Sequence, residues 1–360
     1  MNPMKANRVY ICHTFYHVYV AAVKELVLRH EDKNAGGADL ILSTMSNDFG
    51  SLKDRLEASG VFENIFLFDE KEDVSSEEVM SYHKDRGNIF LNLIQRIRYT
   101  KLLGKLQEPA VPTDLRAYRD VNVFCDSDPI GYYLNYKKIP YHALEDGLNS
   151  GKLDDQARIA NRGAWKLKKF LSKCGLIFIE SGYSRYCIDY EVNDFSANHS
   201  LPENAIEVPR RKLHEKLGAD DRKLLTKIFL ADPEGLIASI KKADKKPPAI
   251  LLTEPLCELP VRKKLFGDII REYEKDHTII IKPHPRDLLD YEKEFPDAVV
   301  IRERFPMEVL NDLGDVRFKK LISVITQTDE VDFADEIVYL GLDFLDKYEA
   351  PEIHRKTELL

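Results

Sequence analysis

Short apolar runs alternate with longer stretches of helical periodicity along the first half of the chain. Short apolar runs are typical of strands buried in a parallel sheet, whereas apolar positions three and four residues apart indicate helices. We expect strands at residues 8–12, 39–42, 64–68, 121–124, 141–144 and 176–179. Helices are expected at 15–28, between the second and third strands, and over most of 75–106 with a break near Gly87. This alternation predicts a parallel, doubly wound sheet.

A polar segment at residues 241–248 indicates a linker, because it combines several lysines with a pair of prolines. The alternation then restarts. Strands are expected at 249–252, 278–281, 298–301, 320–325 and 336–339, and helices at 261–273, at 307–313 and after Gln327. We therefore predict an α/β protein of two Rossmann-like domains, residues 1–240 and 249–360.

Composition narrows the class of protein. The 360 residues are 44% hydrophobic and 32% charged, as in soluble globular proteins, and the net charge of −8 argues against bulk nucleic-acid binding. The five cysteines form no CxxC pair and no zinc spacing, so we expect reduced thiols. No signal peptide and no long apolar span is recognisable. We expect a cytoplasmic protein.

Two motifs follow strand-like runs. The run at 278–281 ends at Lys282-Pro283-His284-Pro285-Arg286, whose prolines fix the chain where open α/β sheets bind ligands. His284 and Arg286 on such a stiff turn are suited to gripping a phosphate. Glu145-Asp146-Gly147 follows the run at 141–144. A carboxylate in one half and a cationic clamp in the other favour group transfer from a phosphate-activated donor.

Several of these residues also have ordinary structural interpretations. An acidic pair before glycine is usually a solvated turn. Thr326 could simply cap a turn, and Glu308 would suit the dipole of a first helical turn. His17 fits a packed helix position, while His13 could line a binding cleft or be buried. Asp126-Ser127-Asp128 resembles a metal-binding DxD motif, but its position after a strand favours a helix N-cap.

The ordered set of motifs resembles glycosyltransferase family 52, the bacterial lipooligosaccharide sialyltransferase family, and more distantly the bacterial polysialyltransferases. The stretches that carry the resemblance are Ile11-Cys12-His13-Thr14, Glu145-Asp146-Gly147, Leu251-Leu252-Thr253-Glu254-Pro255, Pro283-His284-Pro285-Arg286, Pro306-Met307-Glu308 and Ser323-Val324-Ile325-Thr326-Gln327-Thr328. Two features depart from the family pattern. The serine motif reads Thr326-Gln327-Thr328, with Ser323 three residues earlier, and residues 152–246 match poorly.

The resemblance implies a GT-B fold, two Rossmann-like domains facing a cleft. It further implies an inverting, metal-independent transfer of sialic acid from CMP-sialic acid to a terminal sugar of a bacterial surface glycan, lipooligosaccharide or capsule. Asp146 would be the base, Glu145 would orient or replace it, and His284 would balance the charge of the departing phosphate. The donor site would use Thr253, Glu254, Pro285, Arg286, Met307, Glu308, Thr326 and Gln327. The acceptor side would use His13, Thr14 and Gly147.

Other readings stay open. The same fold could use a UDP-hexose donor, or serve as a non-catalytic nucleotide- or glycan-binding protein; an epimerase fits the motifs less well. No cofactor is implied beyond the nucleotide-sugar co-substrate, and a homodimer is plausible for the family. Residues 93–107 and 156–179 carry cations and no acid. They are either solvated helix faces or a surface for anionic lipid or an acidic glycan, which would place the protein at the inner membrane face.

Overall fold

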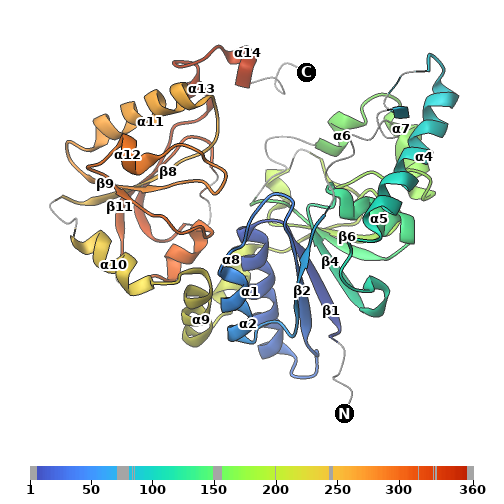
Figure 1. Ribbon diagram of the computed structural model, residues 1–360, viewed down its shortest axis with the longest axis horizontal. Helices are drawn as coiled ribbons and strands as arrows, with labels where there is room; N and C mark the ends of the chain where they lie inside the picture. Colours follow the sequence, from blue (N-terminus) through green and yellow to red (C-terminus); the bar gives the residue numbers. More distant parts are fainter. Residues whose placement is uncertain are drawn as a thin grey trace. The chain divides into compact units, whose positions relative to one another are not determined.

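The computed structural model describes residues 6–70, 81–82, 84, 86–148, 156–198, 200–242, 246–314, 316–326, 328 and 331–354 (Figure 1). The chain forms two compact units, Met1–Gly218 and Ala219–Leu360. In the described parts, no helix is long and apolar enough to cross a membrane.

The described part of the first unit forms a seven-stranded sheet in the order β3-β2-β1-β4-β5-β6-β7, and every pairing is parallel. The strands are β1 (Arg8–Cys12), β2 (Ala38–Ser43), β3 (Ile65–Phe68), β4 (Asp120–Phe124), β5 (Tyr141–Leu144), β6 (Cys187–Val192) and β7 (Ala205–Glu207). The helices are α1 (Phe15–Glu31), α2 (Leu52–Ser59), α4 (Ile89–Gln107), α5 (Pro129–Lys137), α6 (Gln156–Ala160), α7 (Trp165–Lys173) and α8 (Arg210–Glu215), with short 3₁₀ turns η1 (Leu115–Ala117) and η3 (Phe195–Ala197).

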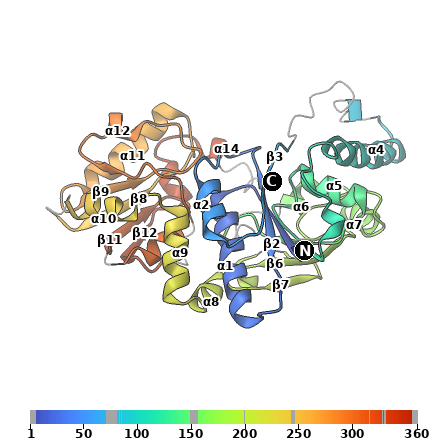
Figure 2. The same ribbon diagram turned by 60° about the horizontal axis from the view of Figure 1, so that its bottom comes forward.

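Helices cover both faces of this sheet, as a doubly wound fold requires. In Figures 1 and 2, α1 and α2 lie on one face and α4 and α5 on the other. All five residues of β1 are buried, and its apolar run from Val9 to Cys12 is typical of a strand covered on both faces. Its neighbours β2 and β4 pair with it along nearly its full length. The central strands are therefore rigid supports for whatever follows their carboxyl ends.

The second unit contains, in its described residues, a five-stranded parallel sheet in the order β10-β9-β8-β11-β12. Its strands are β8 (Pro248–Leu252), β9 (Thr278–Lys282), β10 (Val299–Val300), β11 (Phe318–Ser323) and β12 (Ala334–Tyr339). Its helices are α9 (Ala219–Phe229), α10 (Pro233–Lys242), α11 (Leu259–Tyr273), α12 (Tyr291–Glu294), α13 (Leu342–Leu345) and α14 (Pro351–His354), with the 3₁₀ helix η4 at Met307–Asp312. The predicted pair of parallel α/β sheets is confirmed.

The strand predicted at 176–179 is wrong. Ile177, Phe178 and Ile179 are fully buried, but they belong to a loop that packs under α4 and α7 instead of joining the sheet. The Phe178 N–H reaches the Thr100 hydroxyl at 3.4 Å rather than a neighbouring strand. The sheet is continued by β6, whose mixed sequence Cys-Ile-Asp-Tyr-Glu-Val gave no strand signal.

The division between the units falls after Gly218, earlier than the predicted boundary at residue 240. Helix α9 packs on η4, and the Ala231 N–H beyond it donates to Glu303 at 3.1 Å, so both belong with the second sheet. The polar stretch 241–248 thus connects α10 to β8 within one unit. The helix expected after Gln327 is also absent from the described residues there, since the chain proceeds to β12.

Candidate functional site

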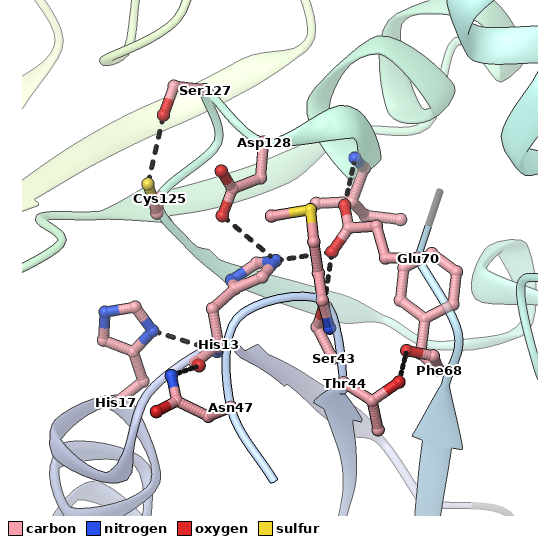
Figure 3. Close-up of polar contacts among 12 residues, drawn as sticks. His13, His17, Ser43, Thr44, Asn47, Phe68, Glu70, Cys125, Ser127 and Asp128 are labelled. Atoms are coloured by element: carbon pink, nitrogen blue, oxygen red, sulfur yellow. Dashed lines mark hydrogen bonds and ion pairs between the residues drawn. The ribbon is translucent and has the colours of Figure 1, made fainter. Parts of the chain in front are cut away.

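The strand order of the first sheet reverses between β1 and β4, which is where open α/β sheets form a crevice at the carboxyl edge. Polar side chains gather there. Figure 3 shows His13 after β1, Ser43 at the end of β2, Glu70 after β3 and Asp128 after β4 turned toward one another. Asp146 follows β5 at the same edge.

His13 is the buried centre of this group. Its ring Nε2 lies 2.8 Å from Glu70 Oε2 and 3.3 Å from Asp128 Oδ2. Glu70 also accepts hydrogen bonds from the Ser43 hydroxyl at 2.7 Å and the Ile130 N–H at 2.6 Å. Burial opposes a charge on the imidazole, but the bond to Glu70 and the two carboxylates raise the pKa of His13 overall. The His13 ring therefore makes its contacts inside the protein. The neighbouring Thr14 caps α1, because its hydroxyl accepts a hydrogen bond from the His17 N–H.

Asp128 begins α5 as the predicted N-cap residue, yet its carboxylate makes no capping hydrogen bond. It turns to His13 instead, and burial raises the pKa of Asp128 to about 6. The preceding Cys125 adopts φ +57°, a left-handed conformation that is uncommon for a residue with a side chain. Such strain often marks functional loops.

His17 holds Asp146. The His13 N–H donates to His17 Nδ1 at 3.1 Å, so the neutral ring carries its hydrogen on Nε2. That nitrogen lies 2.6 Å from the Asp146 carbonyl oxygen and 3.1 Å from Asp146 Oδ1. The His17 ring is buried and stacks on Phe124, with centroids 4.7 Å apart. His17 is therefore a packed helix residue, as expected, but also a fixed donor that sequence reasoning missed.

Asp146 presents its carboxylate to solvent, with 58% of the side chain exposed. Partial desolvation would raise the pKa of Asp146, but the hydrogen bond from His17 and the nearby imidazoles outweigh it and lower that pKa. The carboxylate is therefore charged at neutral pH, and the buried His17 ring orients it. This is the arrangement expected of a base that acts on an arriving hydroxyl.

Glu145 points the other way. Its side chain is buried, and Oε1 accepts the Asn193 N–H at 2.8 Å, which ties the end of β5 to the end of β6. Of the two acidic residues, only Asp146 offers an exposed carboxylate. Gly147 is half-buried in the turn that follows.

The second unit presents His284 on the turn after β9. Its Nδ1 accepts the Arg286 N–H at 3.1 Å, so the neutral ring carries its hydrogen on Nε2. Burial, and then the charges of Arg286 and Lys282, lower the pKa of His284 to about 4. The imidazole of the free protein is therefore neutral near pH 7. Arg286 itself is exposed and Pro285 half-buried.

Asp287, which sequence reasoning missed, braces this turn. Its fully buried carboxylate accepts hydrogen bonds from Arg262 at 2.6 Å, from the Tyr291 hydroxyl at 2.7 Å and from the Thr253 hydroxyl at 3.0 Å. The Thr253 oxygen in turn accepts the His284 N–H at 3.2 Å. Nothing in the sequence separates this aspartate from any other turn residue, because two of its partners, Thr253 and Arg262, lie 34 and 25 residues earlier in the chain.

Glu254 plays a similar part for the loop after β11. It is buried, accepts the Thr326 N–H at 2.6 Å and the Ile325 N–H at 3.1 Å, and also accepts the Thr326 hydroxyl. The Ser323 hydroxyl donates to the Thr326 carbonyl at 2.9 Å. Thr253, Glu254, Ser323 and Thr326 thus have partners within the unit. Gln327, also predicted for the donor site, lies outside the described residues.

Residues of η4 were also predicted for the donor site. Met307 is half-buried and Glu308 is buried in the first turn. Burial lowers the pKa of Lys282 to about 8, and the charge of Glu308 counters that effect. The Lys282 ammonium donates to the Phe305 carbonyl at 2.7 Å. A pocket of about 210 Å³ lies beside His284, lined also by Pro283, Tyr291, Arg302 and Arg304. Among the described residues, no group of three His, Cys, Asp or Glu side chains is placed to hold a metal ion.

Comparison with known proteins decides the family. The model of glycosyltransferase family 52 matches residues 64–327, most of the chain. The chain belongs to glycosyltransferase family 52. This family 52 protein is also 39% identical over 84 residues to an uncharacterised protein of Haemophilus influenzae. That match covers 22% of this chain and 27% of the length of the Haemophilus protein.

One solved structure shares the fold at a TM-score above 0.5. The 2,6-sialyltransferase of Photobacterium sp. JT-ISH-224, crystallised with CMP and lactose, matches at a TM-score of 0.55 and 11% identity over 92% of this chain and 71% of that one. A sialyltransferase from Photobacterium damsela matches at a TM-score of 0.49 and 15% identity, over 92% of this chain and 73% of its own. With its two parallel-sheet units, the family 52 protein has the GT-B fold predicted from its sequence, and it is a glycosyltransferase.

Proposed function

We propose that this glycosyltransferase transfers sialic acid from CMP-sialic acid to a terminal sugar of a bacterial surface glycan, lipooligosaccharide or capsule, with inversion and without a metal ion. The observation that carries the proposal is the exposed, charged Asp146 carboxylate, oriented by the buried His17 ring. The family and the fold shared with a CMP-bound sialyltransferase support this choice of donor.

Asp146 would accept the proton of the acceptor hydroxyl as that oxygen attacks the anomeric carbon. The carboxylate needs no preceding deprotonation, because its pKa is already lowered. His17 cannot turn away, since its Nδ1 is occupied by the His13 N–H and its ring stacks on Phe124. Buried Glu145 would keep this strand end in register rather than exchange protons.

His284 would donate a hydrogen bond from Nε2 to the departing phosphate. The ring is neutral in the free protein, but a bound phosphate would raise its pKa because an adjacent negative charge favours the imidazolium. Arg286 would add a second cationic contact. Thr253 and Glu254 would act indirectly, by holding the two loops on which His284 and Thr326 lie.

Substituting the proposed base tests this assignment. Asp146→Asn keeps the size of the side chain but cannot accept the proton, so we expect the turnover rate to fall by roughly 100-fold or more. Binding of CMP, measured by calorimetry, should be unchanged. The matched control is Asp54→Asn, at an exposed aspartate on α2. A fully active Asp146→Asn enzyme would remove Asp146 from the chemistry.

Two further predictions accompany this function, and one alternative competes with it. A homodimer and a location at the inner membrane face stay predictions. A UDP-hexose donor is the alternative within the same fold, because the serine motif departs from the family pattern at Thr326. We place it second, because the sialyltransferase that shares the fold at a TM-score of 0.55 was crystallised with CMP.

A further inference from the structure

Helices α4 and α7 of the first unit share a small apolar cluster. Leu93 and Ile97 of α4 and Trp165 of α7 pack against the buried side chains of Leu171, Ile177, Ile179 and Tyr183. The two helices lie side by side in both ribbon views (Figures 1 and 2). The exposed residues that these two helices carry outside the cluster are called here the α4–α7 surface.

Large apolar side chains are exposed on the α4–α7 surface. Phe90 is 72% exposed and Phe170 is 63% exposed, and Ile89, Leu91, Ile94 and Leu167 are each more than two-fifths exposed. Phe90 and Ile94 are four residues apart on α4, and Leu167 and Phe170 three apart on α7, so each pair lies on one helix face. Single exposed apolar residues need no explanation, but a group of this size marks an interaction surface.

Cations accompany these apolar residues. Arg98, Lys101 and Lys105 are exposed on α4, and Lys166 and Lys173 on α7. No acidic residue occurs in 89–107 or 156–173, although the whole chain has a net charge of −8. On α7, Lys169 and Lys173 share the carboxylate of Glu203 at 3.1 and 2.9 Å. Burial, and then the charge of Arg96, lower the pKa of Lys168.

The start of α4 lies on the side of the first sheet that also carries the candidate site. Helix α4 follows β3, and in Figure 1 its first turns, which carry Phe90 and Ile94, project on the side of the sheet's carboxyl edge. That edge carries His13 and Asp146. A substrate anchored to whatever binds the α4–α7 surface would therefore be delivered to the reactive edge of the same unit.

We propose that the α4–α7 surface docks the protein on an anionic phospholipid bilayer. Apolar side chains would enter the headgroup layer while the flanking cations contact lipid phosphates, the pattern of interfacial helices. A soluble acidic glycan would use the cations but leave Phe90, Ile94 and Phe170 in water. A second copy would set the same basic face against itself, since symmetric dimers bury one patch on both subunits. The proposal rests on the proposed function only in that the acceptor would be lipid-linked.

Vesicle flotation of the full-length protein tests the docking surface. We expect binding to vesicles of equimolar phosphatidylglycerol and phosphatidylcholine, weak binding to pure phosphatidylcholine, and release by high salt. Phe90→Ser/Ile94→Ser/Phe170→Ser should weaken binding at least tenfold. Arg98→Gln/Lys101→Gln/Lys105→Gln should weaken binding to the anionic vesicles roughly a hundredfold and leave the weak binding to pure phosphatidylcholine unchanged.

Leu288→Ser is the matched control, because Leu288 is 82% exposed in the second unit and should leave binding unchanged. Circular dichroism and transfer to a soluble acceptor should be unaltered in every variant, which separates failed docking from failed catalysis. Vesicle binding by the apolar variant equal to wild type would overturn the proposal. Failure of the wild-type protein to bind vesicles would also overturn it, whether or not the protein binds an acidic polysaccharide. A wild-type dimer that becomes monomeric in the apolar variant would overturn it as well.

Discussion

Asp146 and Glu145 both carry a carboxylate, and they differ in the direction in which the side chain points. Adjacent residues at a strand end point to opposite sides. Glu145 enters the interior and accepts the Asn193 N–H, whereas Asp146 faces solvent with His17 behind it. The sequence showed the acidic pair and its place after a strand, but it could not show which member is exposed. The partner of each lies far along the chain.

His284 illustrates the same limit and gives a prediction. Its position after β9 was predictable, but its pKa depends on burial and on Arg286 and Lys282. We expect the His284 Cε1 resonance of the free protein to show no titration above about pH 5, because a lowered pKa keeps the ring neutral there. Addition of CMP should move the titration upward. The measurement is an NMR pH titration assigned with His284→Gln, and a free-protein pKa near that of exposed histidine would contradict it.

At the scale of elements, buried parallel strands were the most predictable features. β1, β5, β8 and β9 fall within a residue or so of their expected ranges, since strands buried on both faces read as continuous apolar runs. The same rule failed at 176–179, where burial under α4 and α7 produced an apolar run without a strand. The rule of continuous apolar runs also missed β6, because this strand has mixed polarity and is recognisable only by its pairing with β5.

The start of α5 gives a prediction about stability. The pKa of Asp128 is raised to about 6 in the folded protein because partial burial and the charge of Glu70 outweigh the opposing effect of His13. A raised acid pKa means that the folded state binds the proton more tightly than the unfolded state. The contribution is therefore fully present below about pH 4 and is lost as pH rises through about 6, a change on the order of 3 kcal/mol.

Urea unfolding followed by the fluorescence of Trp165, the single tryptophan, reports this effect in the first unit. Wild type should lose stability relative to Asp128→Asn as pH rises from about 4.5 to 7.5, because the amide cannot ionise. A stability difference between the two proteins that stays constant over this interval would show that Asp128 ionises as it does in the unfolded chain.

At the scale of the whole molecule, the repeated strand–helix alternation was enough to predict two parallel α/β units. The boundary between them was not predictable from composition. Helix α9 belongs with the second unit through its contact with η4, almost ninety residues later, while the lysine-rich stretch at 241–248 is only a connection between α10 and β8. Composition marks exposed chain, and only contacts show which compact unit a helix joins.

Transfer from a CMP-sugar is best tested by following the reaction itself. Wild-type protein would be incubated in EDTA with a lactose acceptor and either CMP-sialic acid or UDP-glucose, and the products followed by proton NMR. We predict release of CMP, no reaction of UDP-glucose, and a sialoside of anomeric configuration opposite to the donor's. Turnover of UDP-glucose alone, retention of configuration, or a requirement for divalent metal would contradict this function.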